Sequence, residues 1–436
     1  MTVLALALIG VCVTPMGWIV SDSIFLNEET RAADPFLAET ADINRSPYRG
    51  VFLAEKEEAN YVRVFGFRVS GPRLVFHQIV KPFQAMFRGN ASAREFLYFL
   101  LGSLWTLAVW SFVGVGIARV CVLRLARNEQ AGLDDAFEFA IDKFVTCFAA
   151  VAMPLAAVFG LCIPTFIIGL FLGFDIGTLL VGLFWFVVLA ISAVMGILLL
   201  GLLFSWPLIV SSVATEGQNS FDAMTRAYAY TFQRPIHYLF YLTIAMLFGG
   251  FIWLVVGGLT NGIIDLSYWS TSWGANRTSA NRIEVIKGNL SPHVRAINTK
   301  DLMTDSVTDI ADQSVADQDA GVAEGAANRS RMEITVDDSE QERSAVNLER
   351  GRKIIAFWEG MLKTVAAAFI YGLFWCMATA VYLLLRRDVD ETEMDEVYLV
   401  DERRTYDLPP LQSDSDGIPQ VQPLPNESDG GSGSEA

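Results

Sequence analysis

The chain contains 436 residues, of which 53% are hydrophobic and 18% are charged; its net charge is −16 and its mean hydropathy is +0.38. Soluble globular proteins contain about 25% charged residues and fewer apolar ones, so this composition excludes a soluble cytosolic enzyme, a collagenous chain and a disordered chain. The acidic balance also excludes nucleic acid as an expected partner, because phosphate binding needs a basic surface.

Six long stretches of the chain contain no charged residue. Crossing the hydrocarbon core of a bilayer as a helix takes about 20 apolar residues, and only a helix satisfies the backbone polar groups of such a stretch in lipid. We therefore predict an all-α polytopic membrane bundle with six transmembrane helices. The stretches are Thr2–Ser21, Phe96–Ala118, Phe144–Phe174, Ile176–Thr215, Leu239–Ile264 and Thr364–Leu385.

The first stretch, residues 1–21, has two interpretations. It lacks a basic leading region and a small-x-small cleavage site, which favours an uncleaved membrane anchor over a signal peptide. A misplaced start codon would also explain the missing basic residues. The partner expected here is the lipid bilayer.

Residues 22–94 form the predicted extracytoplasmic segment. Tyr61–Val69 is rich in β-branched and aromatic residues and, with Val51–Leu53, predicts a short hairpin. Residues 72–88 carry apolar side chains at helical spacing, which predicts an amphipathic helix with a kink near Pro82. This helix either lies in the headgroup plane or packs against the other helices of the protein.

Residues 95–264 contain four of the spans and two expected cytoplasmic helices, at 128–143 and 216–234. We expect Trp206-Pro207 to end the fourth span, because proline disfavours a helical residue before it. The first cytoplasmic helix has an acidic face, for which we favour a solvated surface over a cation site, since Ca²⁺ takes its ligands from a tight loop. The carboxylates concerned are Asp134, Asp135, Glu138 and Asp142.

Two acidic segments explain most of the net charge. Residues 265–357 carry eleven basic and fifteen acidic residues, and residues 386–436 carry four and fourteen. We predict that 265–357 is an extracytoplasmic loop that is mostly disordered, particularly at 296–346, where aromatic residues are scarce. A sixth transmembrane helix at 358–387 and a disordered acidic cytoplasmic tail at 388–436 complete the chain.

The short loops decide the orientation, because basic residues stay in the cytoplasm. Basic residues lie in the loop between the second and third spans, in the loop between the fourth and fifth spans and directly after the sixth span. The turn between the third and fourth spans carries only Asp175. This pattern predicts that both termini lie in the cytoplasm. The basic residues are Arg119, Arg124, Arg127, Lys143, Arg226, Arg234, Arg386 and Arg387.

The sequence contains no pattern that predicts catalysis, a metal site or a cofactor. No pair of its three histidines has metal-ligand spacing, and no nucleophile elbow or phosphate-binding loop occurs. The five cysteines lie in or beside the spans, which predicts buried small side chains and no disulfide framework. Gly169 and Gly173 are four residues apart, as Gly114 and Ala118 are, and this spacing allows helices to pack closely.

The segment Thr215–Tyr241 carries the one recognisable motif, at Glu216, Gly217, Ser220, Ala223 and Arg226. Asn219 or Ser220 is suited to cap a helix there, and Asp222 and Arg226 have the spacing of an ion pair. The motif resembles that of an uncharacterised bacterial multi-pass family, and more distantly the membrane domain of some glycerophosphodiester phosphodiesterases. The resemblance covers roughly Phe96–Trp273. It implies placement in the bacterial cytoplasmic membrane and a shared membrane bundle. Because the phosphodiesterase domain is absent, we expect a protein that is not an enzyme.

Three hypotheses for function follow. The first is a non-catalytic structural or interaction component that binds a cytoplasmic protein through 216–234 or through the acidic tail. The second is a transport or lipid-handling protein, which requires a polar cavity at mid-membrane depth between the third span and its neighbours. The third is an intramembrane enzyme, which the absence of ionisable residues within the uncharged stretches disfavours.

Overall fold

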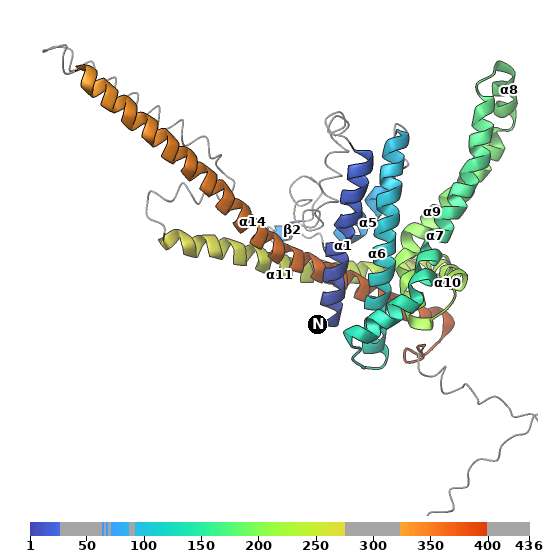
Figure 1. Ribbon diagram of the computed structural model, residues 1–436. Helices are drawn as coiled ribbons and strands as arrows, with labels where there is room; N and C mark the ends of the chain where they lie inside the picture. The colour runs from blue at the N-terminus through green and yellow to red at the C-terminus, as the bar shows by residue number, and fades with distance from the viewer. Residues whose placement is uncertain (27–62, 65–66, 69–70, 87–91, 275–322, 399–436) are drawn as a thin grey trace, which may run out of the picture.

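The computed structural model describes residues 1–26, 63–64, 67–68, 71–86, 92–274 and 323–398. Within these ranges six helices are long and apolar enough to cross a membrane, so the predicted all-α, multi-pass architecture is confirmed. Their bounds are α1 Thr2–Phe25, α6 Ala93–Ala126, α7 Leu133–Phe171, α9 Trp185–Glu216, α11 Pro235–Gly274 and α14 Ala323–Asp390 (Figure 1).

Five shorter elements connect or cover the long helices. They are β1 Arg63–Val64, β2 Phe67–Arg68, α5 Gly71–Met86, α8 Asp175–Leu183 and α10 Ser220–Gln233. The two strands pair antiparallel, Arg63 with Arg68 and Val64 with Phe67. The predicted hairpin therefore closes within the segment 61–69, and Val51–Leu53 lies outside the described residues.

Helices α1 and α6 lie side by side at the centre of the bundle (Figure 1). Two glycines make this close approach possible, because each lies beneath a tryptophan of the other helix. A Cβ at Gly17 would lie 2.1 Å from the ring of Trp105, and one at Gly102 would lie 2.2 Å from the ring of Trp18. Trp18 also donates a hydrogen bond from Nε1 to Thr106 Oγ1 at 3.0 Å. The interface between α1 and α6 therefore requires glycine at these two positions, because a side chain there would collide with the facing tryptophan ring.

The third and fourth spans form an arm that extends from the bundle and ends at α8 (Figure 1). Helix α7 begins at Leu133 and runs unbroken to Phe171, so the predicted separate helix at 128–143 is its first part. The expectation that Trp206-Pro207 ends the fourth span was wrong, because α9 continues through Pro207 to Glu216. Proline is tolerated in a membrane helix where neighbouring helices stabilise the interrupted turn, and Pro207 is buried within the protein.

The last two spans run together away from the centre of the bundle (Figure 1). Helix α14 begins at Ala323, so the prediction of disorder was wrong for 323–346, where a continuous helix leads into the sixth span. Helix α11 likewise continues past Ile264 to Gly274. The remainder of the predicted disorder, at 275–322 and 399–436, lies outside the described residues.

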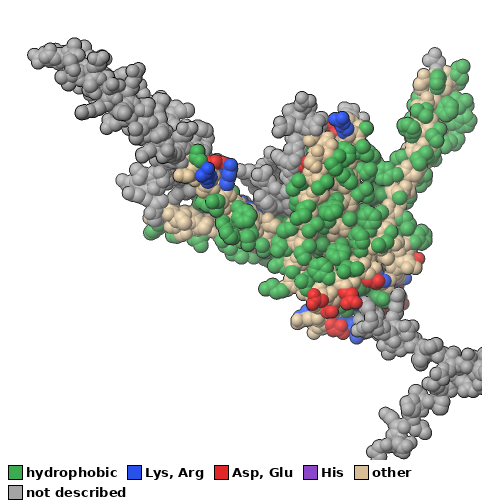
Figure 2. Space-filling view, viewed as in Figure 1, with side chains coloured by type: hydrophobic (Ala, Val, Ile, Leu, Met, Phe, Trp, Pro, Cys, Tyr) green, Lys and Arg blue, Asp and Glu red, His purple; other side chains and the backbone are tan. Residues whose placement is uncertain are grey.

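The amphipathic segment predicted at 72–88 is helix α5, and it packs against α6, α11 and α14. Val75, Ile79 and Ala85 are buried, which supports packing within the protein over a position in the headgroup plane. The outer surface of the bundle and of the arm is broadly apolar, as a lipid-facing surface requires, whereas acidic side chains gather at the end where α7 begins (Figure 2).

Candidate functional site

The motif segment forms a sharp turn between α9 and α10. Gly217 follows the last residue of α9 with a φ of +62°, and its N–H donates to the Val213 carbonyl at 3.0 Å. This left-handed conformation strains residues that have a Cβ, which explains a glycine at this position. The turn places α10 against the end of α9 that the sequence predicts to be cytoplasmic. Asn219 is the N-cap residue of α10.

Glu216, the last residue of α9, lies at the centre of a buried polar cluster. Its side chain is only 7% exposed, and its carboxylate lies 2.5 Å from Arg226 Nη1 and 3.2 Å from Arg386 Nε. The Tyr382 hydroxyl donates to Oε1 of Glu216 at 2.6 Å, and Gln218 donates to Oε2. A buried carboxylate is strongly unfavourable unless it is paired and hydrogen-bonded. Two guanidinium groups pair with the carboxylate and two side chains donate hydrogen bonds to it, which meets this requirement.

Arg226 holds α10 in this cluster. Burial disfavours its charge, but the Glu216 carboxylate and the hydrogen bond to it outweigh that effect, so the pKa of Arg226 is raised. Asp390, the last residue of α14, lies 3.7 Å from Arg226 and accepts a hydrogen bond from the Tyr230 hydroxyl. The ends of α9, α10 and α14 are therefore joined by charged side chains.

After α14 the chain turns back over this cluster as residues 391–398, which we call the C-terminal strap. The Tyr398 N–H donates to the Thr215 carbonyl at 2.8 Å, and Arg119 Nη1 donates to the Tyr398 carbonyl at 2.6 Å. Arg386 Nη1 holds the strap at a second point, the Glu396 carbonyl, at 2.6 Å. The strap thus joins the end of α6 to the turn after α9.

The Tyr398 ring lies between the motif and α7. A Cβ at Gly217 would lie 2.7 Å from this ring, and the Lys143 ammonium lies 5.3 Å from its centroid. An ammonium at this distance is attracted by the negative face of the ring. Gly217 therefore has two roles, because it permits the turn and leaves room for the strap.

The structure brings some of the motif residues together and leaves others apart. Glu216 and Arg226 form an ion pair, and Ala223 is fully buried on the inner side of α10. Ser220 begins α10, but neither it nor Asn219 provides a side-chain cap. The expected pair of Asp222 with Arg226 was wrong, since Arg226 turns toward Glu216 and Asp390 and the Asp222 side chain is exposed.

The two glycines expected to mediate helix packing lie on the arm. A Cβ at Gly169 would meet no atom within 4 Å, and one at Gly173, two residues past the end of α7, would meet only the Leu170 carbonyl at 3.5 Å. Among the residues that the structure describes, neither glycine packs against another helix. By contrast, Gly114 lies against Trp375 of α14, where a Cβ would approach the ring to 2.8 Å.

The sequence pattern did not single out Arg119, Tyr382, Arg386 or Asp390 as parts of one site. A signal was nevertheless present for three members of the cluster. Arg119, Glu216 and Arg386 are each the first charged residue after an uncharged stretch. When such helices run in the same direction, these residues meet at one end of the bundle.

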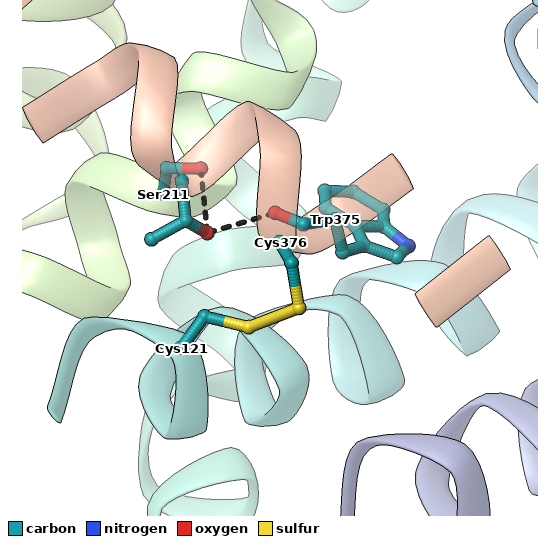
Figure 3. The surroundings of a disulfide bond; sticks show 5 residues. Cys121, Ser211, Trp375 and Cys376 are labelled. Atoms are coloured by element: carbon teal, nitrogen blue, oxygen red, sulfur yellow. Dashed lines mark hydrogen bonds between the residues drawn. A yellow bond between two sulfur atoms is a disulfide. The ribbon is translucent and has the colours of Figure 1, made fainter. Parts of the chain in front are cut away.

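One pair of cysteines contradicts the expectation of no disulfide. Cys121 of α6 and Cys376 of α14 are joined, with their Cα atoms 5.6 Å apart and a sequence separation of 255 (Figure 3). Close by, Thr379 donates to the Trp375 carbonyl at 2.9 Å and lies 3.5 Å from Ser211 of α9. The bond thus fixes α14 to the centre of the bundle.

The charged groups of the polar cluster bind one another. Its carboxylates and guanidinium groups are paired with each other, and the described residues contain no group of three or more side chains placed to hold a metal ion. No known protein family, curated protein or solved structure matches this chain.

Proposed function

We propose that this multi-pass membrane protein is a non-catalytic interaction component, whose binding face consists of α10 and the C-terminal strap. The observation that carries the proposal is the anchoring of the strap by Arg119 and Arg386. The strap leads directly into the acidic segment 399–436, which contains two basic and eight acidic residues. The cluster thereby fixes where that segment leaves the bundle, next to α10.

The exposed side of α10 supports the same proposal. Phe221 and Phe232 are 58% and 49% exposed and lie three turns apart on one side of the helix. Exposed aromatic residues beside an acidic segment are suited to a protein partner that presents an apolar patch with a basic rim. The internal pairing of Glu216 favours a role in fixing this face over a role in chemistry.

We further propose that the protein lies in a bacterial cytoplasmic membrane with both termini in the cytoplasm, in a bundle shared with the resembled families. Support comes from the helix ends predicted to be cytoplasmic, which lie close to one another in the structure. Thr2, next to the N-terminus, donates a hydrogen bond to the Ala131 carbonyl at 3.4 Å, and the ends of α6, α9 and α14 meet at the strap. A reporter fused at Gly132 that reads as extracytoplasmic would contradict this orientation.

Site-specific photocrosslinking tests the proposed binding face. Ala223 and Tyr398 are poor positions for the probe, because Ala223 is buried and Tyr398 packs against Gly217. The probe is better placed at Phe221 or Phe232, with Phe166 on the lipid-facing arm as a matched control, since it is 69% exposed.

The expected result is one discrete protein adduct from positions 221 and 232, which is lost when residues 399–436 are deleted. Position 166 should yield only lipid adducts. If positions 221 and 232 also yield only lipid, the interaction proposal is wrong.

Lipid handling is the second candidate, and one cavity favours it over transport of a polar solute. A cavity of about 330 Å³ lies between α5, α6, α7 and α9, and its walls are almost entirely apolar, including Leu107, Val151 and Trp206. Such walls suit an acyl chain. Gly196 lies on the cavity wall with open space beside it. Gly196→Phe should therefore lower the amount of lipid that co-purifies with the protein in native mass spectrometry, whereas unchanged lipid retention would reject this candidate.

A further inference from the structure

The disulfide between Cys121 and Cys376 lies on the wall of a second apolar cavity. This cavity has a volume of about 590 Å³ and is bounded by α1, α6, α11 and α14, with both cysteines among its lining residues. Most other lining side chains are aliphatic or aromatic, such as Phe248, Leu373 and Ala380. The sulfur atoms are therefore next to a space that apolar molecules can enter.

Both cysteines belong to membrane-spanning helices, which restricts the chemistry that can reach them. Exchange with a thiol requires an attacking thiolate, and an anionic thiolate enters an apolar environment only at a large cost. Water-soluble thiols and their disulfides are therefore poor partners for this pair. A neutral, lipid-soluble oxidant does not face this barrier.

Disulfides in reducing compartments are usually transient or redox-sensing rather than structural. The proposed orientation places Cys121 near the cytoplasmic end of α6, two residues from Arg119, which binds the strap. A disulfide here needs an oxidant of its own. Bacterial membranes supply such an oxidant in the form of quinones.

We propose that the cavity beside Cys121 and Cys376 binds a lipid-soluble quinone, which oxidises the two thiols to the disulfide. Both S–H bonds break and one S–S bond forms. Two electrons and two protons pass to the quinone, which leaves as the hydroquinone. The proposal rests on the proposed orientation in a bacterial membrane but not on the proposed interaction face, because no residue of α10 takes part in it.

Arg124 gives this cavity a polar group that suits a quinone. It lines the cavity and follows Cys121 by one helical turn. One of its N–H groups contacts the Asn128 carbonyl at 3.4 Å, and a guanidinium has five N–H donors. Arg124 therefore keeps donors for a quinone carbonyl, and its positive charge lies near the place where a thiolate forms.

Anaerobic oxidation of the reduced, full-length protein in lipid nanodiscs tests the proposal, with a benzoquinone carrying a ten-carbon alkyl chain as the probe. We expect two thiols to be lost for each quinone reduced, because the disulfide couple transfers two electrons. A protease site inserted within 275–322 narrows the position of the bond, since the two cleaved halves stay linked on a non-reducing gel only if Cys376, the one cysteine of the second half, is joined to a cysteine of the first. Cys121→Ser should abolish the reaction, and Cys147→Ser, which removes a buried free cysteine, should retain it.

Filling the cavity separates quinone binding from simple thiol reactivity. Ala380→Phe places a ring in the cavity one turn from Cys376, and Ala378→Phe makes the same change on a neighbouring side of α14 that lines a different cavity. Ala380→Phe should lose the quinone reaction while diamide, a small thiol oxidant, still closes the bond. Ala378→Phe should keep both reactions, and thermal melting checks that both variants are folded.

The proposal is overturned if the quinone oxidises Ala380→Phe at the parental rate, if only diamide closes the bond in the parent, or if neither oxidant does.

Discussion

The carboxylate of Glu216 and the guanidinium of Arg226 lie 2.5 Å apart and close the turn between α9 and α10. Both residues belong to the motif that the sequence singled out, although ten residues separate them. The same carboxylate binds Arg386 of α14 and the Tyr382 hydroxyl. One side chain thus fixes the ends of three helices, and its removal should affect all three.

Replacement of Glu216 should destabilise the protein strongly. Glu216→Gln removes the negative charge but leaves Arg386, whose side chain is 10% exposed, buried beside it. Breaking a buried ion pair by removing one partner costs about 3–5 kcal/mol, and we expect the lower end because Arg226 is partly exposed. Thermal or denaturant unfolding in detergent measures the loss. Asp222→Asn, which changes an exposed carboxylate on α10, should have an effect within about 0.5 kcal/mol, and equal losses for the two variants would contradict the prediction.

The Tyr382 hydroxyl should contribute through Glu216 rather than independently. Tyr382→Phe removes a hydrogen bond to the carboxylate at 2.6 Å and one to Ser212 Oγ at 3.1 Å. A hydrogen bond to a charged group contributes about 1.5–3 kcal/mol, so a loss of this size is expected. In a double-mutant cycle with Glu216→Gln the two losses should add only in part, because Gln keeps an acceptor for the hydroxyl but lacks the charge that strengthens this hydrogen bond. Additive losses would show that the hydroxyl acts elsewhere.

The residues around Glu216 illustrate how far the sequence alone can lead. The uncharged stretches predict the six spans correctly, because the bilayer imposes one length and one type of backbone pairing on every span. The motif also points to the turn, since a glycine after a long helix is typical of a helix end. These features are local, and periodicity and composition record them.

Long-range partners were beyond such local patterns. Arg226 was expected to pair with Asp222 on its own helix, but it pairs with Glu216 and with Asp390 of α14, 164 residues away. The disulfide between Cys121 and Cys376 joins positions 255 residues apart. Neither partner can be chosen until the relative rotation of α6, α9 and α14 is known. A single sequence does not contain that rotation.

Two glycines of the chain should respond in opposite ways to alanine. At Gly217, the positive φ and the Tyr398 ring 2.7 Å from a Cβ both oppose a side chain. A left-handed conformation alone costs a non-glycine residue about 1–2 kcal/mol, and displacement of the strap adds to this loss. At Gly169 a Cβ meets open space, so Gly169→Ala should be neutral or should stabilise the helix by up to about 1 kcal/mol.

Melting temperatures of the two variants in detergent provide the comparison. Protease digestion adds a second measurement for Gly217→Ala, because a displaced strap should be cleaved near Tyr398 sooner than in the parent. A clear loss of stability for Gly169→Ala would show instead that this side of the arm packs against a second helix, as the spacing of Gly169 and Gly173 first suggested.

The contact of Tyr230 with Asp390 should make stability sensitive to alkaline pH. Burial raises the pKa of Tyr230, and the hydrogen bond to Asp390 and the negative charges of Asp390 and Glu216 raise it further. The unfolded chain, with an ordinary phenol pKa of about 10, therefore loses its proton first. It follows that the stabilisation by neutral Tyr230 is fully present below about pH 10 and is lost as the pH rises through the higher pKa of the folded state.

Tyr230→Phe lacks this titration, so its melting temperature should fall less steeply than that of the parent above about pH 10. Asp390→Asn should give an intermediate slope, because it removes the charge but keeps an acceptor. Parallel curves for the parent and Tyr230→Phe would show that this contact does not control the alkaline response.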